Sequence, residues 1–214
     1  MDIFSRFIDI ALHLDQHLAA LGAQYGVWVY AILFLIIFCE TGLVVTPFLP
    51  GDSLLFVAGA VAASGAMNVH WLVPTLICAA LLGDNVNYFV GRLIGMKLFT
   101  RSNSRFLNRA NVERAHAFYD RHGGKTIILA RFLPIIRTYV PFVAGVAAMP
   151  YRRFIGFSIA GAVLWVVTLS YAGYFFGNIP FVKNNLTFII LALVLIPAVP
   201  ALLEFTRGLR IRRA

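Results

Sequence analysis

Long apolar segments recur along this chain, and they constrain its fold more than any other feature. A membrane-spanning helix needs about 20 predominantly apolar residues, and runs of this kind begin near Val27, Val69, Phe154 and Leu186. Hydrophobic residues make up 60% of the 214 residues, and charged residues only 13%. A single water-soluble core cannot bury so much apolar surface, so the lipid bilayer must solvate most of it. The sequence therefore predicts an all-α polytopic membrane protein.

The predicted spans belong to one membrane transport domain over residues 27–206. About four transmembrane helices are expected, over residues 27–45, 69–94, 154–176 and 186–205. The first 26 residues place apolar and charged side chains on opposite helical faces, which is typical of an interfacial amphipathic helix. Lys and Arg concentrate in cytoplasmic loops, so the basic loop 95–125 and the basic tail 207–214 indicate the cytoplasmic side. We expect a multi-pass protein of the bacterial cytoplasmic (inner) membrane with a cytoplasmic C-terminus.

The net charge of +9 is concentrated in these flanking segments. Attraction to anionic lipid headgroups explains such a distribution better than binding to nucleic acid, which we do not expect. The two cysteines, Cys39 and Cys78, lie inside apolar runs, where a thiol behaves as a small hydrophobe. The sequence gives no indication of a metal site or a cofactor.

Two further apolar segments, residues 46–66 and 126–149, are interrupted by residues that break regular helices. Irregular backbone at membrane depth is tolerated where protein buries it or where it lines a wet cavity, so both segments are predicted to be re-entrant hairpins. The topology is consistent if the first hairpin enters from outside and the second from the cytoplasm. The residues expected to break the hairpins are Pro47, Pro50, Gly51, Pro134 and Pro141.

The two predicted hairpins share a short internal repeat. Phe-Leu-Pro at 48–50 and Phe-Val-Ala-Gly at 56–59 recur as Phe-Leu-Pro at 132–134 and Phe-Val-Ala-Gly at 142–145. Inserted from opposite faces, such a pair has the organisation of inverted-repeat transporters, whose broken segments lie near the substrate site. Chance similarity between apolar segments is the alternative explanation.

Four charged residues, Glu40, Asp52, Arg131 and Arg137, fall inside or at the mouths of apolar segments. Each charge at the centre of a bilayer costs about 2.5–3.5 kcal/mol on insertion scales. Buried ion pairs that hold the hairpins together are one explanation. Because such pairs are an unreliable source of stability, a functional role is the stronger one.

These residue types suit different tasks in transport. Arg131 and Arg137 present planar forks of donors that match a phosphate, so they are predicted to bind a lipid headgroup. Glu40 or Asp52 is predicted to carry a coupling proton, because a carboxylate in a partly dehydrated site can change its protonation state. Asp84 and Asn87 form a polar face of one span, which is either a helix-packing contact or a cavity lining.

The segments Glu40-Thr41-Gly42, 47–53 (Pro-Phe-Leu-Pro-Gly-Asp-Ser) and 131–138 (Arg-Phe-Leu-Pro-Ile-Ile-Arg-Thr) resemble the DedA family of bacterial inner-membrane proteins. The resemblance extends over most of residues 20–206. It implies membership of a superfamily shared with eukaryotic lipid scramblases, and a role in returning undecaprenyl phosphate across the membrane, with dependence on the proton motive force proposed for relatives. It also implies two opposed re-entrant hairpins and functional roles for the four charged residues.

The sequence thus predicts a membrane lipid transporter, a flippase or scramblase, rather than an enzyme. The expected substrate is undecaprenyl phosphate or a related anionic phospholipid, with protons as a possible co-substrate. A proton-dependent transporter of small molecules or ions, an intramembrane hydrolase and a non-transporting scaffold are the alternatives. No histidine falls at the predicted site to serve a lipid phosphatase as nucleophile or base.

Overall fold

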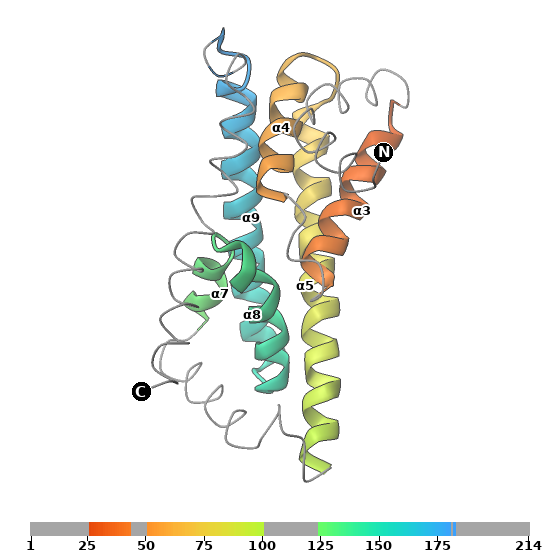
Figure 1. Ribbon diagram of the computed structural model, residues 1–214, viewed down its shortest axis with the longest axis vertical. Coiled ribbons are helices and arrows are strands. Elements are labelled where there is room, and N and C mark those ends of the chain that lie inside the picture. Colours follow the sequence, from red (N-terminus) through yellow and green to blue (C-terminus); the bar gives the residue numbers. More distant parts are fainter. Residues whose placement is uncertain (1–25, 44–50, 101–123, 181, 183–214) are drawn as a thin grey trace, which may run out of the picture. The chain divides into compact units, whose positions relative to one another are not determined.

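The computed structural model describes residues 26–43, 51–100, 124–180 and 182, and all regular structure in this part of the chain is α-helical. The all-α prediction is confirmed for these residues. The predicted N-terminal helix, the last span, most of the basic loop and the basic tail lie outside them. The helices are α3 (Trp28–Gly42), α4 (Gly51–Ala63), α5 (Val69–Thr100), α7 (Lys125–Ala130), α8 (Pro134–Val146) and α9 (Tyr151–Phe176) (Figure 1).

Two of these helices are long and apolar enough to cross a membrane. They are residues Val69–Gly95 of α5 and the whole of α9, and they coincide with two of the predicted spans. α3 is a shorter apolar helix within a third predicted span.

The chain divides into two compact units. The first consists of residues 1–36, 48–76 and 166–214, and the second of residues 37–47 and 77–165. Since α3, α5 and α9 extend across these boundaries, each of them supplies residues to both units.

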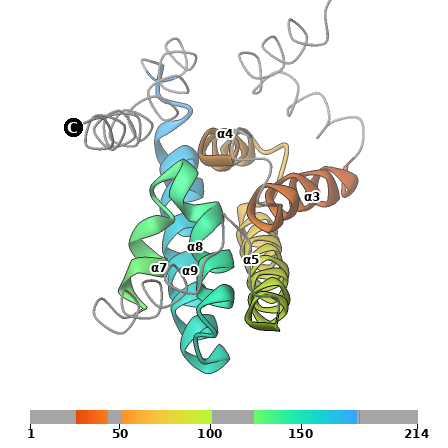
Figure 2. The ribbon, with the colours of Figure 1, turned by 60° about the horizontal axis from the view of Figure 1, so that its bottom comes forward.

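In the second unit, two short helices fill the second predicted hairpin segment. α7 ends in a tight turn, in which the amides of residues 131–133 donate to carbonyl groups three residues earlier. Leu133 is extended, as expected before a proline, and Pro134 begins α8 in the first turn, where its missing N–H costs nothing. α7 and α8 then pack against each other (Figure 2). The re-entrant path of this segment through a membrane stays a prediction.

Pro141 does not act as expected. It lies inside α8, which continues to Val146, although an interior proline removes a backbone hydrogen bond. The expected break at Pro141 is therefore wrong for this helix. Pro134 and Gly51 do lie at helix starts, whereas Pro47 and Pro50 fall outside the described residues.

In the first unit, α4 is buried on almost all sides, and it packs closely against the C-terminal part of α9. A Cβ added at Gly59 of α4 would collide with the carbonyl oxygen of Ser170, and a Cβ added at Gly173 of α9 would collide with the carbonyl oxygen of Phe56. The absence of both side chains lets the two backbones touch, as at small-residue contacts between membrane helices.

In the second unit, α8 makes the same kind of contact with α5. A Cβ at Gly145 of α8 would collide with the carbonyl oxygen of Tyr88, and a Cβ at Gly91 of α5 would collide with that of Phe142. The spacing also matches, since Gly91 follows Tyr88 by three residues and Gly173 follows Ser170 by three. The repeated Phe-Val-Ala-Gly segments thus make equivalent contacts, while the inverted relation of the two hairpins stays a prediction.

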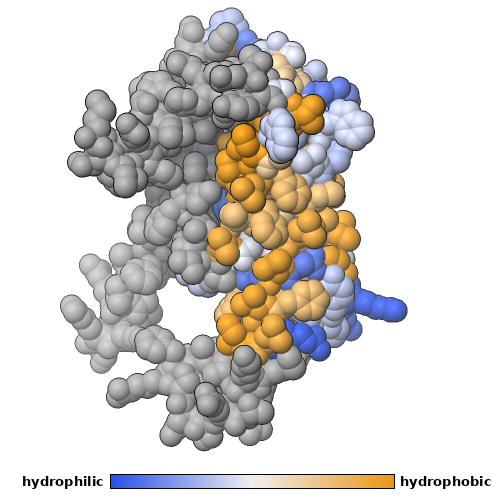
Figure 3. All heavy atoms as spheres, turned by 90° about the vertical axis from the view of Figure 1, so that its right-hand side faces the viewer, coloured by the Kyte–Doolittle hydropathy of each residue, from blue (hydrophilic) through white to orange (hydrophobic). Residues whose placement is uncertain are grey.

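The C-terminal half of α5 has two different faces. One face carries Asp84, Asn87 and Tyr88, which are buried together with the three glycines of this helix. The opposite face is exposed and apolar, as is much of the face of the molecule drawn in Figure 3. Its residues are Leu82, Val86, Phe89, Val90, Leu93 and Ile94. An exposed apolar stripe of this length is what a helix presents to lipid, with its polar groups turned toward neighbouring helices.

Candidate functional site

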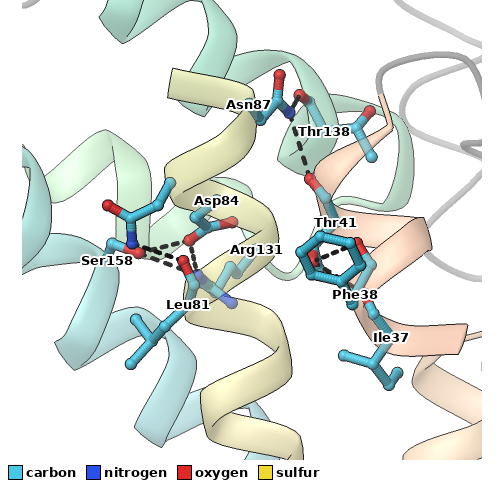
Figure 4. Close-up of polar contacts among 10 residues, drawn as sticks. Ile37, Phe38, Thr41, Leu81, Asp84, Asn87, Arg131, Thr138 and Ser158 are labelled. Atoms are coloured by element: carbon cyan, nitrogen blue, oxygen red, sulfur yellow. Dashed lines mark hydrogen bonds and ion pairs between the residues drawn. The ribbon is translucent and has the colours of Figure 1, made fainter. Parts of the chain in front are cut away.

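Arg131 lies in the turn between α7 and α8 and is only 5% exposed. Its Nη2 forms an ion pair with the Oδ2 of Asp84 from α5, and lies 3.3 Å from the Oγ of Ser158 from α9. The Ser158 hydroxyl in turn donates to the same carboxylate oxygen of Asp84 (Figure 4). Three separate segments therefore meet at one buried charge pair.

Arg137 lies in the first turns of α8 and is 7% exposed. Its Nη2 pairs with the Oε1 of Glu40, which is in the last turn of α3 and is fully buried. Glu40 reaches this position because it continues the buried face that Leu33 and Ile37 form on α3. The predicted association of Glu40 with an intramembrane arginine thus has a defined geometry.

The Trp165 ring, from the middle of α9, lies close to both arginine side chains. The guanidinium carbon of Arg137 is 4.9 Å from the ring centroid, and that of Arg131 is 5.9 Å away. Both distances are within the range of cation–π attraction, which grows as water is excluded. Trp165 is itself only 1% exposed, so it holds two like charges in a dry environment.

Asn87 connects this region to the end of α3. Its side-chain amide donates to the carbonyl oxygens of Thr138 at 2.6 Å and Thr41 at 3.3 Å (Figure 4). α3 can approach α5 here because Gly42 and Gly83 meet without side chains; a Cβ at Gly42 would lie 3.2 Å from the Cα of Gly83. Asn87 is therefore a helix-packing residue in this conformation.

The structure thus assembles a cluster that we call the arginine site. It brings together three of the four predicted charges and adds one acid that sequence analysis had assigned only to packing or a cavity lining. The fourth predicted charge, Asp52, belongs to the first unit, where it lies in the first turn of α4 and is partly exposed. The arginine site consists of Glu40, Asp84, Arg131, Arg137, Ser158 and Trp165.

Sequence analysis missed Ser158 and Trp165. A signal existed for Trp165, because it falls in the middle of a predicted span, whereas tryptophans prefer the membrane interface. Ser158 is followed at i+3 by Gly161, and this small, polar stripe indicated a close helix contact. In the described residues, no three His, Cys, Asp or Glu side chains are grouped as metal ligands.

Comparison with known proteins identifies the family of this chain. The VTT domain family matches residues 49–175. The chain is also 56% identical over 212 residues to the protein DedA of Escherichia coli K12, covering 98% of this chain and 97% of that relative. The chain belongs to the DedA family. The resemblance to this family that the charged motifs indicated is therefore confirmed.

Two further relatives are named as membrane proteins. The uncharacterized membrane protein Rv0364 of Mycobacterium tuberculosis is 47% identical over 198 residues, which are 90% of this chain and 86% of that protein. The inner membrane protein YghB of Escherichia coli K12 is 37% identical over 191 residues, or 88% and 87% of the two chains. No solved structure matches. These relatives support a location in the bacterial inner membrane, and the side on which the C-terminus lies stays a prediction.

Proposed function

We propose that this DedA-family protein is a lipid transporter, a flippase or scramblase, that moves undecaprenyl phosphate or a related anionic lipid across the inner membrane. The arginine site binds the phosphate headgroup, while the polyprenyl or acyl chain stays in the surrounding lipid. The protein acts by transport and does not hydrolyse the headgroup. Protons are its expected co-substrate.

The observation that carries this proposal is the burial of Arg131 and Arg137, both within cation–π distance of the same ring, that of Trp165. Arginine remains charged in proteins and binds phosphate through several N–H groups at once. Two arginines that share one aromatic neighbour therefore form a suitable site for one phosphate. Intramembrane charges of this kind generally mark a substrate or ion pathway.

A second observation concerns the unused hydrogen-bonding capacity of Arg131. Its Nε–H is buried and, among the described residues, has no hydrogen-bond partner. It lies beside Gly161 of α9, where an added Cβ would be only 3.1 Å away. Buried donors normally have partners, so an unsatisfied guanidinium donor is consistent with a site that an anionic ligand completes.

The direct test is transport by the purified protein in liposomes. Labelled undecaprenyl phosphate is incorporated into both leaflets, and a phosphatase that cannot cross the membrane is added outside. Without transport only the outer-leaflet lipid is hydrolysed, whereas with transport the inner-leaflet lipid becomes accessible as well. Repeating the assay with and without a pH gradient measures proton coupling. Lack of any difference between protein-containing and empty liposomes would contradict the proposal.

Conservative substitutions test the role of the two arginines. Arg131→Lys and Arg137→Lys keep the positive charge but lose the planar fork, so each should slow headgroup movement strongly. Arg152→Lys is the matched control, because Arg152 is exposed in the first turn of α9 and outside the arginine site. Lipid movement at the parent rate by both site variants would exclude a headgroup role for these arginines.

The same liposomes distinguish the alternatives. A hydrolase releases inorganic phosphate from the lipid when no phosphatase is added. A transporter of small molecules or ions leaves lipid distribution unchanged but dissipates an imposed proton gradient when its substrate is present. Either result would replace the lipid-transport proposal.

A further inference from the structure

The arginine site contains equal numbers of buried positive and negative charges. Arg131 is paired with Asp84, and Arg137 is paired with Glu40, and all four residues are at most 7% exposed. Taking an uncompensated charge into such an environment costs several kcal/mol per ion. Any ligand that binds here must therefore leave the site close to neutral.

A phosphate monoester brings about 1.5 to 2 negative charges at pH 7. When it pairs with the two arginines, it displaces Asp84 and Glu40 from them. If both carboxylates stayed ionised, the buried site would acquire the full negative charge of the ligand. Neutrality is restored if each displaced carboxylate takes up one proton from the aqueous phase and releases it when the ligand leaves.

Ser158 makes Asp84 suited to hold such a proton. A hydroxyl is both a donor and an acceptor, and in this structure Ser158 donates to the Oδ2 of Asp84. Rotation of the hydroxyl would let Ser158 Oγ accept a hydrogen bond from protonated Asp84 at the same place. Both protonation states of Asp84 are thus satisfied without movement of α5 or α9.

We propose that Asp84 is a proton-exchanging carboxylate of the arginine site, so that a doubly charged phosphate monoester binds together with two protons, one on Asp84 and one on Glu40. This rests on the proposed binding of phosphate by the two arginines. The charged groups that Asp84 faces are Arg131 from the α7–α8 turn and, in the same cluster, Arg137 from α8 and Glu40 from α3. A singly charged phosphodiester requires only one proton by the same balance.

The test counts protons taken up during binding to the full-length protein in detergent micelles. Calorimetric titrations are made in buffers of different ionisation enthalpy, at a pH well above the second phosphate pKa of about 6. The probes are dodecyl phosphate, a dianion, and its methyl ester, a monoanion with the same chain. We expect two protons per dodecyl phosphate and one per methyl ester.

Variants assign these protons to residues. Asp84→Asn should reduce the uptake with dodecyl phosphate by one proton, and Glu40→Gln should do the same. Asp120→Asn, in the predicted basic loop, is the control and should leave the count at two. Infrared difference spectra should show two new carbonyl bands of protonated carboxylic acids in the parent, one of which disappears in each site variant.

The outcomes separate this inference from the proposed function. Two results would overturn the role of Asp84 while phosphate binding stands. In the first, Asp84→Asn binds dodecyl phosphate and takes up as many protons as the parent. In the second, the parent takes up the same number of protons with both probes. Failure of the parent to bind either probe overturns the proposed function itself. If Asp84→Asn does not fold, the infrared spectrum of the parent decides, because two acid bands support the inference and one or none refutes it.

Discussion

α4 in the first unit and α8 in the second carry the same Phe-Val-Ala-Gly segment but different chemistry. Each helix presses its glycine against a backbone carbonyl of a long helix, α9 in one unit and α5 in the other. At the start of α8, Arg137 enters a buried ion pair, whereas α4 starts with the partly exposed Asp52. The repeated feature is therefore a packing contact, whereas the charged residues in the first turns of the two helices differ in sign and in burial.

This difference has a physical origin. A glycine contact needs only complementary shape, which a duplicated segment reproduces wherever a second helix offers a smooth surface. A buried charge instead needs a partner of opposite sign at a defined place, and duplication of one segment does not supply it. The two copies are thus expected to respond alike to changes in packing and differently to changes in charge.

The largest expected difference between the copies concerns their sidedness in the membrane. In a background without Cys39 and Cys78, a cysteine at Ser64 after α4 should react with an impermeant reagent only from the periplasm. A cysteine at Ala148 after α8 should react only from the cytoplasm. Both positions are exposed, so labelling reports sidedness rather than burial. Reaction of both cysteines from one face would rule out opposed hairpins.

Neutralising one member of a buried ion pair should be costly in the second unit. Arg131→Gln leaves Asp84 without its charged partner, and such changes lower the free energy of unfolding by about 3–5 kcal/mol. The double variant Arg131→Gln/Asp84→Asn should recover a large part of that loss. Arg153→Gln, at an exposed position of α9, is the control and should cost much less. Denaturant titration in mixed micelles measures the free energy of unfolding of the parent, the three variants and the single variant Asp84→Asn. If the loss in the double variant equals the sum of the losses from its two single changes, the two residues are not a coupled pair.

Filling the glycine contacts should affect both units to a similar extent. Gly59→Ala and Gly145→Ala force a Cβ into facing backbone, and overpacking of this kind costs about 1–3 kcal/mol. Gly156→Ala in α9 is the control, because nothing lies near an added Cβ there, and alanine is the better helix former by about 1 kcal/mol. Thermal unfolding in detergent should show a lowered unfolding midpoint for Gly59→Ala and Gly145→Ala, and an unchanged or raised midpoint for Gly156→Ala. A lowered unfolding midpoint for only one of the two site variants would mean that the two glycine contacts are not equivalent.

The smallest expected effects are at the turns that follow α4 and α8. Gly65 and Ala148 both have positive φ angles, of 89° and 50°, and this conformation costs an alanine about 1 kcal/mol or more. Gly65→Ala should therefore destabilise the protein and Ala148→Gly should stabilise it, each by about 1 kcal/mol. Shifts of the same sign in the melting temperatures of the two variants would show that backbone strain is not the deciding term.

The sequence was sufficient to predict α5 and α9, and the span that contains α3, because apolar runs of this length leave few alternatives. It also identified Glu40, Arg131 and Arg137, since a charge inside an apolar run is conspicuous. It did not predict which acid pairs with which arginine, because those residues are brought together by helices far apart in the chain. Asp84 and Arg131 are 47 positions apart, and Glu40 and Arg137 are 97.

The remaining gaps have similar reasons. Proline usually interrupts a helix, but Pro141 remains inside α8, where tertiary packing overrides local preference. The contribution of Trp165 depends on the face of α9 that it occupies, and a single tryptophan in an apolar run does not reveal what lies beneath its ring. The predicted proton-coupling role of Asp52, the hairpin topology and the lipid substrate stay predictions.

The position of Trp165 also provides an intrinsic optical reporter. The chain has three tryptophans, and the other two, Trp28 and Trp71, are exposed. Replacing these two with phenylalanine would leave one indole whose fluorescence depends on the two adjacent guanidinium groups. Any event that moves an arginine away from the ring would then change the emission of the unlabelled protein, so occupancy of the site can be followed in real time without attaching a dye.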